Sequence, residues 1–170
     1  LQVGWFLRNM VALQQAQLSD SFEKIQLVQK SEWVPRVTAA CETFYDQYHP
    51  ERRYHGTVRK IAAVSDVEYD EWLAESVVLI EVISAVANNT VVECIIRNTP
   101  ICVNRHPGPE YYLGKGYPLF YEHFSDIPDV LTIDNVLAAH HYLRTLDKWW
   151  IHGDAFCEHL QAACRQHLPE

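Results

Sequence analysis

The chain has 170 residues, a length that predicts one domain with a single hydrophobic core. Hydrophobic residues make up 48% of it, which excludes an intrinsically disordered chain. Fourteen Lys and Arg against 22 Asp and Glu leave a net charge of −8, so we expect no nucleic-acid partner and no binding to an anionic membrane. The longest apolar runs, near 77–83 and 91–96, are far shorter than the roughly 20 residues of a membrane span, so we expect no transmembrane segment.

The five cysteines are odd in number and scattered, with no C-x-x-C pair. This pattern favours reduced thiols and therefore a cytoplasmic location. We find no signal peptide. The first residue is not Met and the strand pattern starts at once, so we expect the chain to be a fragment of a longer protein.

Short apolar or β-rich runs alternate with segments of helical spacing along the chain. The patterns predict strands at 1–6, 24–28, 58–64, 77–83, 100–104 and 117–121. They predict helices at 31–48, 69–74 and 89–97, and C-terminal helices over about 134–167 that pack back onto the domain. The 77–83 run is almost wholly apolar, as expected of a parallel strand covered on both faces. We therefore predict a single α/β domain over residues 1–170, with helices on both faces of a parallel sheet.

The loop after the 77–83 strand carries the strongest indication of a ligand site. In an open parallel sheet, ligands bind at the carboxyl ends of the strands. Asn88, Asn89 and Thr90 are good capping residues at the start of the next helix, where free N–H groups and the helix dipole favour an anion such as phosphate. Glu93, one turn later, either accepts from a ligand hydroxyl or closes a capping box.

The end of the first predicted strand offers a second, weaker site. Gly4 allows a close backbone turn, and Arg8 has the fork geometry to pair with a diphosphate. A lone glycine after a strand is also an ordinary turn residue, and that alternative stays open.

Several segments, in their order along the chain, resemble a known family. They are Val64-Ser65-Asp66, the apolar strand, the Asn-Asn-Thr loop, Val91-Val92-Glu93 and Arg97-Asn98-Thr99-Pro100-Ile101. Together they resemble the C-terminal donor-binding domain of a two-Rossmann-domain (GT-B) glycosyltransferase. The resemblance is strongest over residues 64–121.

The resemblance implies a Rossmann-like sheet that binds a nucleotide-sugar, as donor substrate rather than cofactor, for glycosyl transfer to an unknown acceptor. It implies that Glu93 binds the ribose and that the loop with Ser65 and Asp66 lies against the base. The acceptor-binding N-terminal domain of such enzymes does not fit within this chain, so we expect the isolated chain to be inactive. The residues implied to hold the donor diphosphate are Gly4, Arg8, Asn88, Asn89 and Thr90.

Two departures from the family pattern support an alternative function. The acidic residue that often stands eight positions before the ribose glutamate is Ala85 here, and Asn-Asn-Thr replaces a Gly-Phe-Gly element. A non-catalytic glycosyltransferase-like scaffold or interaction domain is therefore the second hypothesis. A nucleotide-sugar epimerase on the same architecture is the third.

The remaining polar residues give weaker indications of a functional site than the Asn-Asn-Thr loop does. His106 follows a predicted strand and is the candidate catalytic residue, as a general acid or base or a sugar contact, although a loop histidine with no partner is the more ordinary interpretation. The His and Cys residues lack the tight spacing of zinc ligands, so we expect no metal. The basic cluster at 51–55 is typical of a solvated loop.

Overall fold

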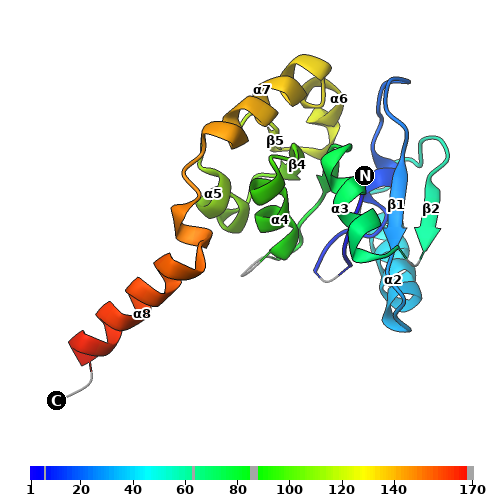
Figure 1. Cartoon of the computed structure of the whole chain (residues 1–170). Coiled ribbons are helices and arrows are strands. Elements are labelled where there is room, and N and C mark those ends of the chain that lie inside the picture. Colours follow the sequence, from blue (N-terminus) through cyan, green and yellow to red (C-terminus); the bar gives the residue numbers. More distant parts are fainter. Residues whose placement is uncertain (6, 63, 85–87, 168–170) are drawn as a thin grey trace.

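The structure, a computed structural model, describes residues 1–5, 7–62, 64–84 and 88–167. It has a mixed α/β fold in which strands alternate with helices, as the sequence patterns predict (Figure 1). In chain order the elements are α1 (Ala12–Gln15), β1 (Ile25–Val28), α2 (Trp33–Tyr48), β2 (Arg59–Ala62), α3 (Asp66–Ala74), β3 (Val78–Ile80), α4 (Asn89–Arg97), β4 (Ile101–Asn104), α5 (Pro107–Leu113), β5 (Phe120–Tyr121), α6 (Ile127–Val130), α7 (Ile133–Thr145) and α8 (Gly153–His167), with short 3₁₀ turns at Phe124–Asp126 and Trp149–Ile151.

The strands form two parallel sheets. β1 pairs with β2, and Ile25 lies opposite Arg59. In the other sheet β4 lies between β3 and β5, with Val78 opposite Ile101. The strand predicted at 1–6 is not a regular strand, because Gln2 makes only an isolated bridge. Phe6 lies outside the described residues.

The backbone of Leu1 and Gln2 nevertheless joins the two sheets. Leu1 forms backbone hydrogen bonds with Val77, just before β3, and with Leu79 in β3. Gln2 forms backbone hydrogen bonds with β1, so the amino-terminal segment lies between β1 and β3. In space the order is therefore β2, β1, residues 1–2, β3, β4, β5. The four bonds are Leu1 N to Val77 O at 2.7 Å, Leu79 N to Leu1 O at 2.8 Å, Gln2 N to Ile25 O at 2.8 Å and Leu27 N to Gln2 O at 3.0 Å.

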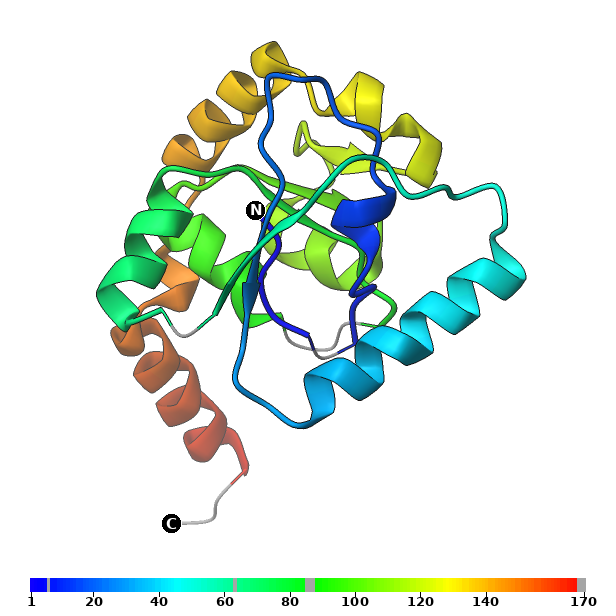
Figure 2. The same cartoon turned by 90° about the vertical axis from the view of Figure 1, so that its right-hand side faces the viewer.

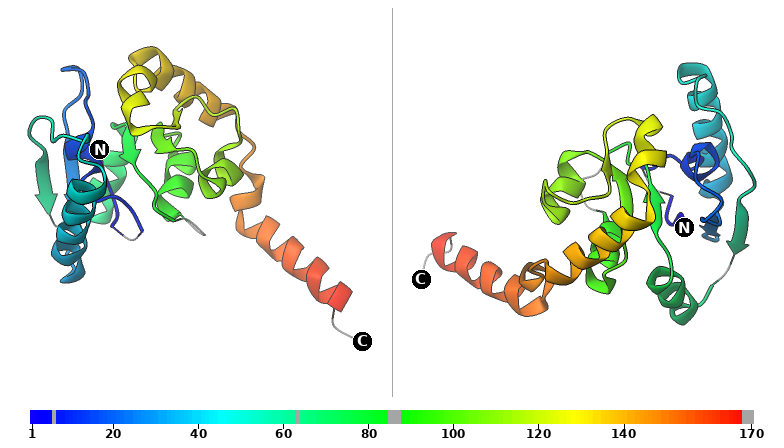
Figure 3. Two further views of the ribbon diagram at one scale, coloured as in Figure 1. Left: turned by 180° about the vertical axis from the view of Figure 1, so that it is seen from behind. Right: turned by 90° about the horizontal axis from the view of Figure 1, so that it is seen from above.

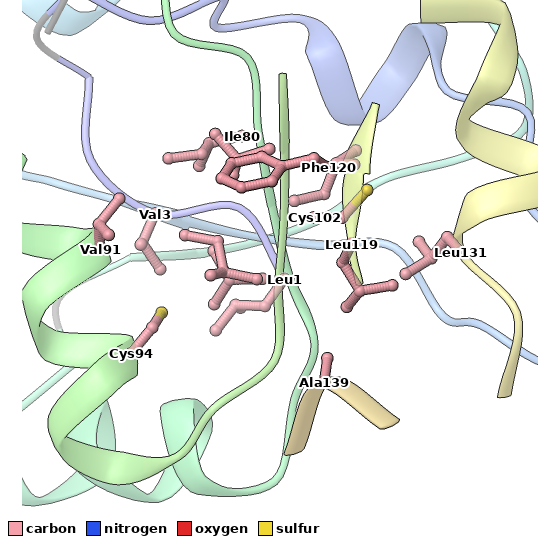
Figure 4. Packing of buried hydrophobic residues seen from close by; sticks show 14 of the residues in the cluster. Leu1, Val3, Ile80, Val91, Cys94, Cys102, Leu119, Phe120, Leu131 and Ala139 are labelled. Carbon is pink, nitrogen blue, oxygen red and sulfur yellow. The ribbon is translucent and has the colours of Figure 1, made fainter. Parts of the chain in front are cut away.

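Helices cover both sides of this arrangement. α4 and α5 lie on one side of β3–β5, and α1 and α2 lie on the other (Figures 1 and 2). All three residues of β3 are buried, which confirms that the 77–83 run is covered on both faces over Val78–Ile80. Apolar side chains from the strands, from α4 and from α7 meet in the main core (Figure 4). A smaller apolar cluster lies under α2, where Val34 and Cys41 meet Met10.

Helix α4 shows how local sequence sets an element of this fold. Its apolar residues Val91, Cys94 and Ile95 recur at three- and four-residue steps and are fully buried. Asn98, with φ of +58°, ends the helix in the left-handed conformation that asparagine tolerates. The helix predicted at 89–97 is confirmed with the same bounds.

The C-terminal helices differ from the prediction. α7 packs on the core through Ala139 and Leu143, but α8 extends away from the body of the domain (Figures 1 and 3). Residues 156–166 are exposed. The expectation that both helices pack back is therefore wrong for α8. Trp150 and Ile151 pack on the core and Ala155 is buried, but no residue of the helix from 156 to 166 is covered. Among the described residues, no helix is long and apolar enough to span a membrane.

Candidate functional site

A cavity of about 670 Å³ opens where the amino-terminal segment, β1 and β2 end, beside α3 and α4. Its volume is in the range of small-molecule sites. We call it the Glu93 cavity. The residues that matter to its chemistry are Gly4, Lys30, Ser65, Asp66, Tyr69 and Glu93. Four of these, Gly4, Ser65, Asp66 and Glu93, are residues that the sequence assigned to a donor site.

Glu93 is held in place by a residue of the neighbouring helix. The Tyr69 hydroxyl on α3 donates a 2.7 Å hydrogen bond to Glu93 Oε2 on α4. Burial, and then this carboxylate, raise the pKa of Tyr69, so the hydroxyl stays protonated and remains a donor. The cap of α4 is Asn88, which places Glu93 beyond the capping-box position. Glu93 thus presents a fixed acceptor to the cavity.

Ser65 and Asp66 also line the cavity, at the start of α3. Ser65 caps this helix, and its hydroxyl and backbone N–H both donate to Glu68 Oε2, at 2.8 and 2.7 Å. Glu68 N–H in turn donates to Ser65 Oγ, which completes a capping box. The predicted base loop therefore borders the cavity, while its serine hydroxyl serves the helix cap.

Position 4 requires glycine. Its φ is +72°, and a Cβ at this residue would lie 2.2 Å from Arg8 Nη1. The missing side chain lets the Arg8 guanidinium pack directly against the backbone turn. The backbone turn expected at Gly4 is present, and the space beside it is filled by the Arg8 side chain.

Arg8 lies behind Gly4, and its guanidinium bonds within the protein. Nη1 donates to Val3 O at 2.6 Å and to Thr90 Oγ1 at 2.9 Å, and Nη2 donates to Asn88 Oδ1 at 2.9 Å. Nε is buried and has no partner among the described residues. Burial lowers the pKa of Arg8, an effect partly opposed by the nearby Tyr69 and Glu93. Arg8 does not line the Glu93 cavity, so the structure makes it a link inside the protein rather than a group facing a ligand.

Of the three predicted diphosphate residues at the start of α4, two bond within the protein as Arg8 does, and one is exposed. Asn88 and Thr90 are buried and accept from Arg8, and Asn88 also caps the helix by accepting from Val91 N at 3.4 Å. Asn89 is exposed at the first helical position. None of the three lines the Glu93 cavity. Ala85 lies outside the described residues.

His106 has a structural partner. It caps α5, and its Nδ1 accepts from Gly108 N at 3.1 Å. It is half-buried and does not line the Glu93 cavity. The structure thus gives the candidate catalytic histidine a capping role, which differs from both the catalytic prediction and the alternative of a loop histidine with no partner.

Two residues of the cavity, Lys30 and Tyr69, were not predicted from the sequence. Lys30 follows β1 and is the one cation among the lining residues that the structure describes. Its position just after a parallel strand was the available indication. Tyr69 was recognised only as part of a helical pattern, because its contact with Glu93 depends on how α3 packs on α4.

The charges of the cavity suit a ligand with hydroxyl or amino donors. Three carboxylates, on Asp66, Glu68 and Glu93, share the cavity with the Lys30 ammonium. Within the residues that the structure describes, no three His, Cys, Asp or Glu side chains come together as metal ligands would. In comparisons with known proteins, no family model and no curated protein sequence matches the chain.

Proposed function

We propose that this chain is a nucleotide-sugar-binding domain with a Rossmann-like fold, the donor-binding half of a glycosyltransferase related to the GT-B type. The spatial order of the chain supports the fold. Numbered along the sequence, with residues 1–2 as the first segment, the order is 3-2-1-4-5-6, which is the order of doubly wound nucleotide-binding sheets. In such sheets the ligand binds where the order reverses, here between the amino-terminal segment and β3.

One observation carries the proposal: the Glu93 carboxylate, fixed by Tyr69, faces a cavity at this edge of the sheet. A carboxylate accepts hydrogen bonds only, which matches the two hydroxyls of a ribose. The loop with Ser65 and Asp66 borders the same cavity and supplies polar groups for a base. A nucleoside therefore finds groups in this cavity that complement its ribose and its base.

The donor diphosphate belongs near Gly4 and the first turn of α4. The buried Arg8 charge lies directly behind Gly4, and the N–H groups at the helix start favour an anion. In glycosyl transfer, charge builds up on the leaving diphosphate, and fixed positive groups stabilise it. Arg8 acts at a distance in this scheme, and Asn89 is exposed beside the diphosphate position.

The sugar acceptor is bound by a second domain outside this chain, so the isolated chain binds donor without turnover. The odd number and scattered spacing of the cysteines in the sequence are the basis for proposing a cytoplasmic location. The same fold binds many donors, so binding experiments are needed to identify the base, the sugar and the acceptor.

The test is a set of thermal-shift measurements with UDP, GDP, ADP and CMP. A nucleotide at about ten times its dissociation constant stabilises by roughly 1.4 kcal/mol, or about 3–6 °C for a chain of this size. We expect one nucleotide to give such a shift and Glu93→Gln to abolish it. The matched control is Glu71→Gln, which removes an exposed carboxylate of α3 outside the cavity. A shift that survives Glu93→Gln contradicts the assignment of Glu93.

The alternative is a glycosyltransferase-like interaction domain. It is favoured by the exposed α8, where Phe156 and Leu160 remain 64% and 51% accessible, and by the internal hydrogen bonds of Arg8. Under this alternative none of the four nucleotides shifts the melting temperature, and the wild-type chain and Glu93→Gln behave alike.

A further inference from the structure

A second cavity, of about 620 Å³, opens at the carboxyl ends of β3, β4 and β5. It shares no lining residue with the Glu93 cavity. Residues that follow the three strands line it together with the segment after α2, which carries the basic cluster at 51–55. We call it the Arg52 cavity. The cluster was expected to be a solvated loop. Glu51, Arg53 and Tyr54 are exposed as expected, whereas Arg52 packs against Glu81 and Phe124.

A desolvated ion pair forms part of the cavity wall. Arg52 Nη1 donates to both carboxylate oxygens of Glu81, at 2.9 and 2.8 Å, and the two side chains are only 14% and 13% exposed. Asn9 Nδ2 adds a 2.7 Å bond to Glu81 Oε2. The Arg52 guanidinium also lies 4.3 Å from the centre of the Phe124 ring. These contacts fix this part of the wall, because Arg52 and Glu81 each have a further partner beside one another.

Gln15 lines the same cavity and has an unused donor. The residue is 3% exposed, and its Oε1 accepts from Asn9 at 3.1 Å. Its Nε2 is buried and has no hydrogen-bond partner among the described residues. A buried donor without a partner is costly, and native proteins contain few of them. The terminal torsion of glutamine is broad, so a small rotation brings this amide to an acceptor at the cavity floor.

The charges around the cavity favour an anionic ligand. The carboxylates of Glu51, Glu81 and Glu122 each have a partner already, in His49, Arg52 and Arg105 respectively. Arg53 also lines the cavity, is exposed, and makes no ion pair with any residue that the structure describes. The cavity therefore presents an unused donor and an exposed cation, whereas its three carboxylates are paired.

We propose that the Arg52 cavity binds the phosphate group of a small phosphate monoester, with Arg53 and Gln15 as donors. A phosphate monoester carries three strong acceptor oxygens and nearly two negative charges at neutral pH, which matches several donors beside a cation. The proposal does not depend on the nucleotide function, because the two cavities have no lining residue in common.

Titration of the whole chain with inorganic phosphate and with glycerol 3-phosphate, followed by amide NMR shifts, tests the site. We expect saturable shifts in the residues around Arg52, with tighter binding of the ester if the cavity holds an organic group. Arg53→Gln weakens binding about tenfold, the order of one charge-assisted hydrogen bond. The control Arg144→Gln, on the exposed face of α7, leaves binding unchanged.

Gln15→Met separates binding from folding. It removes the unpartnered donor, so we expect phosphate affinity to fall severalfold while the urea midpoint stays the same or rises. The proposal is overturned if neither probe saturates, or if Arg53→Gln and Arg144→Gln weaken binding equally. It is also overturned if Glu93→Gln, and not Arg53→Gln, removes the phosphate shifts, because the phosphate then occupies the Glu93 cavity.

Discussion

The guanidinium of Arg8 occupies the space against Gly4 where any other residue has its Cβ. A Cβ on Gly4 would lie 2.2 Å from Arg8 Nη1 and 2.8 Å from Cζ. The same guanidinium donates to Val3, Asn88 and Thr90. The Arg8 side chain thus joins the turn after the amino-terminal segment to the start of α4. Arg8 and its partner Thr90 are 82 residues apart in the sequence.

Gly4→Ala tests this packing against a matched glycine. Gly56 has nearly the same backbone, with φ of +69°, but nothing lies within 4 Å of its Cβ position. Alanine at either residue meets the left-handed strain of about 1–2 kcal/mol. At Gly4 it must also displace the bonded guanidinium, so we expect a further loss of about 1–3 kcal/mol in urea unfolding. Equal losses for the two variants contradict the tight packing.

Arg8→Met tests the hydrogen bonds themselves. The substitution leaves three buried acceptors, on Val3, Asn88 and Thr90, without their donor. We expect the free energy of unfolding to fall by about 2–3 kcal/mol, whereas Arg144→Met on the surface changes it by less than about 0.5 kcal/mol. A small loss at Arg8 would mean that the desolvation of the guanidinium cancels its hydrogen bonds.

Tyr69→Phe tests the contact between α3 and α4. The variant loses only the hydroxyl that donates to Glu93 Oε2 at 2.7 Å. A double-mutant cycle with Glu93→Gln, read from urea unfolding, isolates the pair, and we expect a coupling energy of about 1 kcal/mol. Additive effects of the two substitutions show that the bond contributes nothing to stability.

Local patterns predicted the elements that depend on local contacts. α4 begins after a capping Asn88, buries residues at helical steps and ends at Asn98, and all three features are visible in the sequence. β4 is a short apolar run between turn residues and was placed within one residue. α5 was missed, although a capping His106 followed by Pro107 at the first helical position is typical of a helix start.

The surroundings of Arg8, Arg52 and α8 depend on contacts between residues distant in sequence, so local patterns did not predict them. Arg8 was expected to face a ligand, but its partners on α4 are brought to it by the pairing of the amino-terminal segment with β3. Arg52 was expected in a solvated loop, and it is desolvated by Glu81 and Phe124, which are distant in sequence. Periodicity gives α8 an apolar stripe, but it does not say whether another surface covers that stripe.

Stability should fall in alkaline solution. Burial raises the pKa of Tyr45, Tyr69, Tyr117 and Tyr121, and of the Cys94 and Cys102 thiols, above their ordinary values. The folded chain therefore keeps protons that the unfolded chain releases. By linkage, this contribution is complete below about pH 8 and is lost as pH rises through about 9–10 and beyond.

Urea midpoints at about pH 7, 9 and 10.5 measure this loss, and tyrosinate absorbance follows the ionisation. We expect Tyr121→Phe, which removes a fully buried phenol, to flatten the decline. Tyr111→Phe is the control, because that ring is 82% exposed. A midpoint that stays constant throughout this pH range contradicts the linkage.

Truncation of α8 tests how far the stable domain extends. Residues 156–166 are exposed, and the helix leaves the body of the domain (Figure 3), so removal of residues 158–170 deletes few native contacts. We expect the free energy of unfolding, measured with urea, to change by less than about 0.5 kcal/mol. A chain ending at Lys148 also loses Trp150 and Ile151, which pack on the core, and Trp150 lies 5.4 Å from the Tyr112 ring. That shorter chain is expected to lose about 2–4 kcal/mol. If the first truncation is equally damaging, α8 is stabilised by self-association, and the midpoint of the full chain then depends on its concentration.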